Sequence, residues 1–233
     1  MKARNFIDNI RKTGRTFLTE YESKEFLALR GIPVVSCQVA RDEEETVKIA
    51  RHCGFPVVLK VNSPRIVHKS ERGGVFLNLP GEEAVREAFR NIKRNCAAVD
   101  PEAAVTVQPM LKKGVEVLIG TIADRQFGPV VAFGLGGIFT EVLEDIVFRM
   151  APVSAAEAEK MVCQIKGNCL LRGYRGNPAV DTPSLQKIIT NISQLAVEMG
   201  DIEEMDLNPV VVYPRGAMVL DARIKLSQFP SGS

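Results

Sequence analysis

The sequence has no tryptophan, only two histidines and no long run of basic residues. Lysine and arginine total 30 and aspartate and glutamate 28, and because the two signs are interleaved the formal net charge is only +2. Proteins that bind nucleic acid usually carry a basic patch with aromatic side chains among the cations. We therefore expect no nucleic acid among the partners of this chain.

Long apolar runs and paired cysteines are missing as well. The longest nearly apolar run, residues 129–140, contains three glycines and is too short to cross a bilayer. The N-terminal residues M-K-A-R-N-F-I-D-N-I-R lack the apolar centre of a signal peptide. No C-x-x-C pair occurs, and most of the five cysteines lie in apolar patterns, which indicates reduced, buried thiols and disfavours a zinc site. They are Cys37, Cys53, Cys96, Cys163 and Cys169. We expect a cytoplasmic protein that does not enter the membrane.

What is present is typical of a globular protein. Hydrophobic residues make up 45% and charged residues 25% of 233 residues, enough for one large domain or two small ones. Capping residues and apolar spacing predict helices over residues 3–13, 19–30, 42–54, 82–97, 154–165 and 182–200. Strands are predicted over residues 34–40, 56–61, 75–79, 104–110, 115–123, 129–134, 205–213 and 218–223, with further strand material up to residue 151. Because several strands form hairpins, we expect an α+β fold of two lobes with a cleft between them.

The stretch Ile66–Val75, I-V-H-K-S-E-R-G-G-V, has little to bury and follows an apolar strand. Gly73 and Gly74 would let the backbone approach a phosphate closely, with amide N–H groups as donors. His68 is a candidate nucleophile, since an imidazole with the ordinary pKa of about 6.5 is largely neutral at pH 7. The alternative is a solvated loop with a structural turn at the glycines.

Two charged residues each interrupt an apolar strand. Burying the unpaired ammonium of Lys60 would cost several kcal/mol, so we expect an anionic partner, for which nucleotide phosphate is suitable. The alternative is an edge strand whose lysine reaches water. Glu116, in G-V-E-V-L-I-G, is placed either to accept hydrogen bonds from ribose hydroxyls or to pair with Lys112 or Lys113.

Oxygen-bearing side chains gather near the C-terminus. Asp206 and Asn208 share one face of the strand M-D-L-N-P-V-V-V, and a hairpin with a tight turn puts Asn208 roughly opposite Asp221. Oxygen ligands of this kind suit magnesium, which bridges to nucleotide phosphates. A slip of one residue in the register would separate the pair, and the alternative is an asparagine that caps a turn beside a surface aspartate.

Three further features are weaker candidates for phosphate contacts. The glycine-rich stretch at residues 134–137 is, taken alone, more often a turn motif than a phosphate site. Arg149 and Arg175 would suit a phosphate clamp, but each also fits an ordinary surface ion pair.

Taken together, these motifs resemble those of the β subunit of ADP-forming acetyl-CoA (acyl-CoA) synthetase, an ATP-grasp protein related to the β subunit of succinyl-CoA synthetase. The resemblance extends from about Leu18 to Leu226. It rests on P-V-V-L-K, H-K-S-E-R-G-G-V, Q-F-G-P-V-V-A-F-G-L-G-G-I-F-T-E-V-L-E-D, L-R-G-Y-R-G and D-L-N-P.

The resemblance implies an ATP-grasp fold that holds nucleotide between two lobes. It also implies an N-terminal arm over residues 1–17, lobes over 18–110 and 111–226, and a tail over 227–233. The cofactors would be ATP or ADP and Mg²⁺, with the metal on Asn208 and Asp221. The nucleotide-binding residues would be Lys60 on the phosphates, Gln108, Met110 and Leu111 in the adenine hinge, Glu116 on the ribose, and Arg149.

The resemblance further identifies His68 as a catalytic phosphohistidine. A CoA-binding α subunit would form acyl phosphate and take the phosphoryl group on a histidine of its own. The group would then pass to His68 and on to ADP, in an assembly expected to be an α2β2 heterotetramer. Two alternatives stay open: a ligase subunit for another acid, such as succinate or an aryl acid, and a regulatory nucleotide-binding subunit without turnover. His68 separates the last from the first, because a subunit that only binds nucleotide needs no nucleophile.

Overall fold

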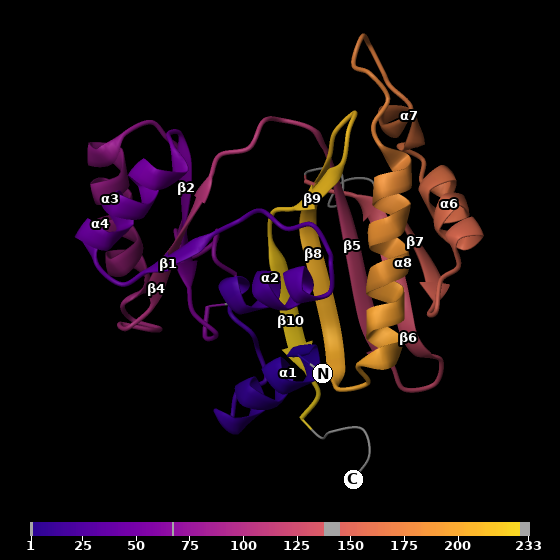
Figure 1. The fold of residues 1–233 in the computed structure, drawn as a ribbon, viewed down its shortest axis with the longest axis horizontal. Coiled ribbons are helices and arrows are strands. Elements are labelled where there is room, and N and C mark those ends of the chain that lie inside the picture. Colours follow the sequence, from indigo (N-terminus) through magenta and orange to yellow (C-terminus); the bar gives the residue numbers. More distant parts are fainter. Residues whose placement is uncertain (1, 67, 138–144, 229–233) are drawn as a thin grey trace. The chain divides into compact units, whose positions relative to one another are not determined.

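The computed structural model describes residues 2–66, 68–137 and 145–228. The chain divides into two compact units, shown in Figure 1. Unit 1 comprises Met1–Leu18, Ser23–Val34 and Lys113–Ser233, and unit 2 comprises Thr19–Glu22 and Val35–Lys112. Each unit has a hydrophobic core of its own.

Unit 2 contains a four-stranded antiparallel sheet with the order β1-β4-β2-β3. Its strands are β1 (Gln38–Ala40), β2 (Val57–Asn62), β3 (Val75–Leu79) and β4 (Ala104–Pro109). Two helices, α3 (Glu43–Cys53) and α4 (Glu82–Cys96), contact each other and the sheet. Because side chains alternate along a strand, the odd-numbered residues of β2 enter this core together with Val105 and Val107 of β4. Lys60 and Gln108 share the opposite face.

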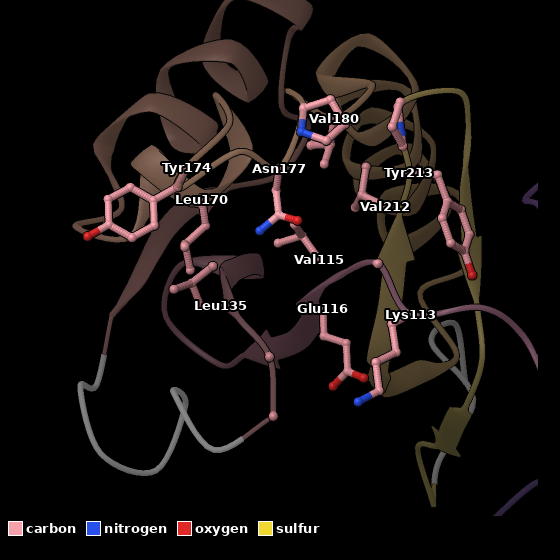
Figure 2. Close-up of a pocket in the computed structure, with 15 residues that line it drawn as sticks. Lys113, Val115, Glu116, Leu135, Leu170, Tyr174, Asn177, Val180, Val212 and Tyr213 are labelled. Atoms are coloured by element: carbon pink, nitrogen blue, oxygen red, sulfur yellow. The ribbon is translucent and has the colours of Figure 1, made fainter. Parts of the chain in front are cut away.

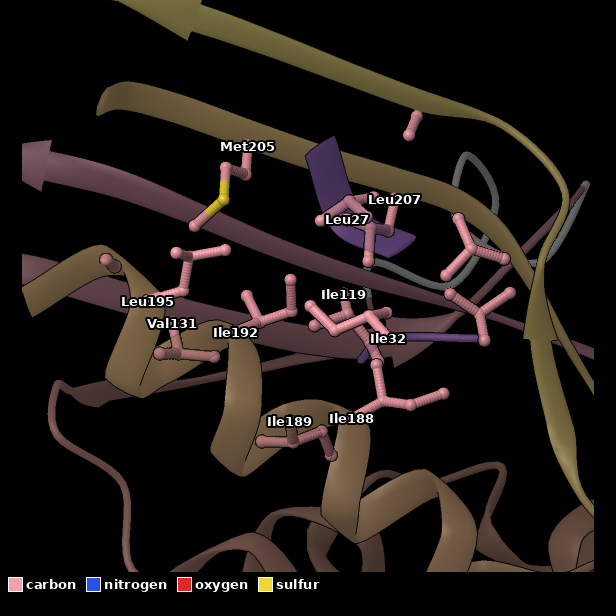
Figure 3. Close-up of a cluster of buried hydrophobic side chains, with 14 of the residues drawn as sticks. Leu27, Ile32, Ile119, Val131, Ile188, Ile189, Ile192, Leu195, Met205 and Leu207 are labelled. Atoms are coloured by element: carbon pink, nitrogen blue, oxygen red, sulfur yellow. The ribbon is translucent and has the colours of Figure 1, made fainter. Parts of the chain in front are cut away.

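Unit 1 contains a six-stranded sheet with the order β10-β8-β5-β6-β7, and β9 pairs with β8. Its strands are β5 (Val115–Asp124), β6 (Gly128–Leu135), β7 (Ile146–Met150), β8 (Ile202–Val212), β9 (Ala217–Val219) and β10 (Ala222–Leu226). Its helices are α1 (Lys2–Lys12), most of α2 (Glu20–Leu29), α6 (Ala155–Gln164), α7 (Asn168–Leu171) and α8 (Thr182–Glu198). The buried face of α8 packs on β5 and β6, where Ile188, Ile192 and Leu195 lie among the side chains of the sheet (Figure 3).

Three helix starts follow the capping rules, as predicted. Thr19 and Glu22 exchange hydrogen bonds between side chain and backbone, with Glu22 accepting from the Thr19 N–H at 2.8 Å. The Asp42 carboxylate accepts from the Glu45 N–H at 2.8 Å. A second capping box joins Ser154 to Glu157, the third residue of α6. These local signals predicted the helix starts correctly.

Two expectations were wrong in detail. The strand predicted over residues 34–40 is reduced to β1, because Val34 bridges to Val219 in unit 1 whereas residue 35 already belongs to unit 2. The cysteines are free but mostly not buried: only Cys96 is, and Cys163 and Cys169 are exposed. Cys163 lies at the end of α6 and Cys169 in the short helix α7, and at these positions the side chain faces water although the sequence pattern is apolar.

The first helix, predicted as an arm for a partner, buries Ala3, Ile7 and Ile10 in the core of unit 1. Its role toward a partner, and the predicted lobe boundaries, stay predictions. Among the described residues, no helix combines the length and apolarity that crossing a membrane requires.

Candidate functional site

The histidine loop leaves β2 and returns as β3, and it closes on itself through backbone hydrogen bonds. The Gly74 N–H donates to the Lys69 carbonyl (2.8 Å) and the Gly73 N–H to the Ser70 carbonyl (3.0 Å). Both residues must be glycine: Gly73 has a φ of +61°, and a Cβ on Gly74 would lie 2.6 Å from Cγ1 of Val61. The glycines therefore make a tight turn.

This turn corrects one sequence-based expectation. The two glycine amides were expected to donate to a phosphate, but both are already engaged by carbonyl groups of the loop. The loop therefore offers its side chains. His68 is 68% exposed, and its Nδ1 lies 3.5 Å from a carboxylate oxygen of Glu71, so that Nε2 is the nitrogen turned away from this neighbour. An exposed imidazole on a fixed turn is suited to nucleophilic chemistry.

The buried Lys60 of β2 has a protein partner. Its Nζ lies 2.8 Å from one carboxylate oxygen of Glu20, and Nζ of Lys69 lies 2.7 Å from the other. The expectation that Lys60 needs an anion is thus met within unit 2, and the alternative of an edge strand does not apply, because β2 lies between β3 and β4. One carboxylate therefore bridges the two ammonium groups.

In unit 1, the register of β8 and β10 brings Asn208 and Asp221 together. Ala222 pairs with Leu207, so Asp221 lies opposite Asn208, whose N–H donates to the Asp221 carbonyl at 3.2 Å. Asp206 and Asn208 lie on the face opposite the buried Met205 and Leu207. Three oxygen-bearing side chains therefore share one end of one sheet face, a donor set that fits Mg²⁺.

An apolar pocket in unit 1 has Glu116 on its wall. Its volume is about 470 Å³ and it lies where β5 begins and β6 and β8 end. In Figure 2, Glu116 and Lys113 point into the same space, and Leu135, Leu170 and Val212 supply apolar walls. An apolar pocket with a few convergent polar groups is the usual form of a small-molecule site.

Residues 9–226 match the ATP-grasp domain family. The chain is 45% identical to acetate–CoA ligase [ADP-forming] I subunit beta of Pyrococcus furiosus, over 97% of this chain and 98% of the relative. The chain belongs to the ATP-grasp family of ADP-forming acyl-CoA ligase β subunits.

Solved structures of this ligase family agree in fold. Acetyl-coenzyme A synthetase 1 of Ca. Korarchaeum cryptofilum, in complex with coenzyme A and Ca-AMPCP, matches with a TM-score of 0.92 and 45% identity, over 97% of this chain and all of that one. Another structure of that protein, with coenzyme A and Mg-AMPPCP, has a phosphohistidine segment pointing towards its nucleotide binding site; its TM-score is 0.84 at 44% identity, with the same coverage. The predicted family, ATP-grasp fold and ligase class are confirmed.

The predicted hinge residues of the ligase lie at the end of β4. Gln108 is buried opposite Val58, and the Met110 N–H donates to the Pro56 carbonyl at 3.0 Å. Leu111 follows in the extended connection that leads to unit 1, whose boundary falls at Lys112/Lys113. Their contact with adenine stays a prediction.

The two arginines each have contacts within the protein. Arg149 in β7 pairs with Val131, on the face that carries the core, and its guanidinium donates to Gln164 and to the Phe148 carbonyl. Arg175 lies over the ring of Tyr174 at 5.3 Å. Neither shares the face of Asp206, so their role in phosphate binding stays a prediction.

Two residues near the histidine loop had no signal in the sequence. Glu20 reads as an ordinary acidic residue in the first turn of a helix, yet it is the partner of both lysines. Asn95 of α4 donates its side-chain N–H to the Gly73 carbonyl at 3.0 Å. Only the tertiary structure brings either of them to the loop.

Proposed function

We propose that this chain is the nucleotide-binding β subunit of an ADP-forming acyl-CoA ligase, in which His68 carries a phosphoryl group to ADP. The overall reaction is acyl-CoA, ADP and phosphate to acid, ATP and CoA. A CoA-binding α subunit, which we expect in an α2β2 assembly, would form the acyl phosphate. The observation that carries the proposal is the exposed imidazole of His68. It lies on a turn in which the amides of Gly73 and Gly74 and the Gly73 carbonyl already have hydrogen-bond partners in the protein.

The relay has three displacements. On the α subunit, the lone pair of a neutral imidazole nitrogen attacks the phosphorus of the acyl phosphate, an N–P bond forms, and the carboxylate leaves with the electrons of the P–O bond. A ring nitrogen of His68 then attacks the same phosphorus, and the imidazole of the α subunit leaves with the electrons of its N–P bond. In the third step a β-phosphate oxygen of ADP attacks this phosphorus, and the imidazole of His68 leaves. Phosphoryl transfer needs chiefly positioning and charge neutralisation, and the ammonium groups of Lys60 and Lys69, both positioned by Glu20, have the required sign of charge.

The remaining contacts follow from the residues described above. Lys60 would contact the phosphates, Glu116 the ribose hydroxyls, and the hinge residues the adenine. Asn208 and Asp221 would hold Mg²⁺, which when bound neutralises charge on the phosphate oxygens. The protein's cytoplasmic location stays a prediction.

The test uses the reverse reaction. Incubating the chain with γ-labelled ATP and Mg²⁺ should produce an acid-labile, base-stable label, which His68→Ala abolishes while ADP affinity stays nearly intact. His52→Ala is the matched control, because His52 is the chain's second histidine and is exposed on α3. A label that survives in His68→Ala would refute the carrier role. ADP binding without any label in the unmodified chain would instead favour a regulatory nucleotide-binding subunit.

The metal assignment has a test of its own. Asp221→Asn removes one negative charge from the proposed ligands and should raise the Mg²⁺ concentration needed for half-maximal labelling by about tenfold or more. The label formed at saturating Mg²⁺ should recover in part. An unchanged Mg²⁺ dependence would show that Asp221 is not a ligand.

A further inference from the structure

Glu20 holds two lysines that the proposed function uses separately. Its side chain is 1% exposed, and each carboxylate oxygen accepts from one ammonium group, that of Lys60 at 2.8 Å and that of Lys69 at 2.7 Å. Lys60 is buried in β2 and is the proposed phosphate contact. Lys69 directly follows His68 in the loop. One carboxylate therefore joins the phosphate-binding lysine to the histidine loop.

From this arrangement we infer that Glu20 is a positioning residue for phosphoryl transfer, an inference that rests on the proposed function. Through Lys69 it fixes the backbone next to His68, because the Lys69 carbonyl also accepts the Gly74 N–H that closes the turn. The Val61 N–H in turn donates to the Gly74 carbonyl at 2.7 Å. In this arrangement the turn that bears His68 is held from Glu20 on one side and from β2 on the other.

The shared carboxylate also couples nucleotide binding to the loop. Lys60 and Lys69 share the two oxygens of one carboxylate, so each ammonium group weakens the attraction of that carboxylate for the other. A phosphate that accepts hydrogen bonds from Lys60 draws its ammonium charge toward the nucleotide. The pair between Lys69 and Glu20 then tightens, so the loop is held more firmly when nucleotide is bound. By linkage, a held loop favours nucleotide binding to the same degree.

A purely structural role for Glu20 predicts something different. A carboxylate needed only to neutralise Lys60 would be satisfied by one ammonium, and Lys69, at the edge of the loop, would have no need to leave water. The side chain of Lys69 is nevertheless only 16% exposed, compared with 68% for the neighbouring His68. A structural role also gives no reason for the loop to respond to ADP.

Hydrogen–deuterium exchange of the full chain tests the anchoring, with and without Mg-ADP. In the unmodified chain, the amides of residues 72–74 should exchange more slowly when Mg-ADP is present. Lys69→Met leaves the buried pair of Lys60 and Glu20 intact and should speed exchange in this segment by about tenfold or more, the usual weight of a charged hydrogen bond. It should also remove the response to ADP. The control is Lys48→Met, because Lys48 is an exposed lysine on α3 in the same unit. Its exchange in residues 72–74 should match that of the unmodified chain.

The second readout separates positioning from binding. Lys69→Met should lower the single-turnover rate of His68 labelling by about tenfold while the ADP dissociation constant changes by less than about threefold. Glu20→Gln should slow labelling as well, and the double variant should be no slower than the slower single one, because both changes break the same contact. Where Glu20→Gln fails to fold, Lys69→Met alone decides.

The inference about Glu20 would be overturned if the unmodified chain is labelled normally and Lys69→Met changes neither the amide exchange of residues 72–74 nor the single-turnover rate of labelling. That result would leave the proposed function standing. Absence of a label in the unmodified chain would overturn the proposed function, and exchange in Lys69→Met would still decide whether Glu20 anchors the loop.

Discussion

Lys60 combines a buried side chain with a charged ammonium group. It lies in the middle of a strand and its ammonium is held by a carboxylate that is itself buried. Breaking a buried ion pair is costly, so a protein that keeps one at a ligand site gains a fixed position for the charge. We expect that fixed ammonium to serve phosphate.

Replacing Lys60 by alanine should weaken ADP binding by about 1.5–3 kcal/mol, the usual contribution of a hydrogen bond to a charged group. Glu20 keeps Lys69 in this variant, so its carboxylate is not left without a cation. Isothermal titration calorimetry of Lys60→Ala against Lys48→Ala, below the melting temperature of both, measures the difference. Equal affinities would remove Lys60 from the phosphate site.

At this scale the sequence predicts charges well and their partners poorly. A lysine within P-V-V-L-K-V is visible as an exception to an apolar strand, so its need for an anion could be predicted. Its partner could not be predicted, because Glu20 lies 40 residues earlier and resembles any acidic residue at a helix start. The opposition of Asn208 and Asp221 was within reach, because a short hairpin limits the possible registers.

Elements were predictable where their signals are local. Capping boxes act over three residues, so Thr19 with Glu22 and Ser154 with Glu157 marked their helices correctly. The start of α8 shows the limit. Thr182 and Pro183 predicted the start, but the capping residue is Asp181, and one of its oxygens also accepts the Gly216 N–H at 2.8 Å. That second bond spans 35 residues and leaves no local trace.

Asp181 therefore links the start of α8 to the turn after β8, beside the pocket wall. Hydrogen bonds from the backbone of Ser184 and Gly216, and then from the Ser184 hydroxyl, lower the pKa of this carboxyl below its ordinary value. A group with a lowered folded pKa stabilises the protein above its unfolded pKa, and that contribution is lost as pH falls through the folded pKa.

We expect the unmodified chain to be more stable than Asp181→Asn from neutral pH down to about pH 4, the ordinary aspartate range. Below that, the difference in free energy of unfolding should shrink and level off once Asp181 is protonated. Urea denaturation at a series of pH values between 6 and 3 measures it. A difference that stays constant over the series would mean that the charge of Asp181 contributes nothing.

On the scale of the whole molecule, each of the two units is built from segments that are separated in the sequence. Unit 1 takes both ends of the described sequence: the Leu18 N–H donates to the Ile224 carbonyl at 3.1 Å, and Phe17 bridges to Lys225. Contacts over such separations carry no periodic signal, so sequence reasoning could predict an α+β fold of two parts but not which segments make up each. The ATP-grasp family assignment came from the motifs, because those are contiguous.

The extent of the whole chain bears on which part of the reaction it can carry out without a partner. It aligns with 98% of a relative that is itself named a β subunit, and none of its motifs resembles a CoA site. If acyl phosphate forms on another chain and ADP binds here, the two reactants never share a pocket, and a histidine that carries the group becomes necessary. This requirement explains why a subunit that binds nucleotide would keep a nucleophile on an exposed turn.

The purified chain should therefore form no ATP from acetyl-CoA, ADP, phosphate and Mg²⁺, although it takes label from ATP on His68. Adding a CoA-binding α subunit should start turnover, and His68→Ala should prevent it even in the complete assembly, whereas His52→Ala should not. Coupled assay of ATP formation, with the same preparations tested for labelling, separates loss of the carrier from loss of folding. Robust turnover by the chain alone would show that both reactants bind here and that no partner is needed to bring the phosphoryl group.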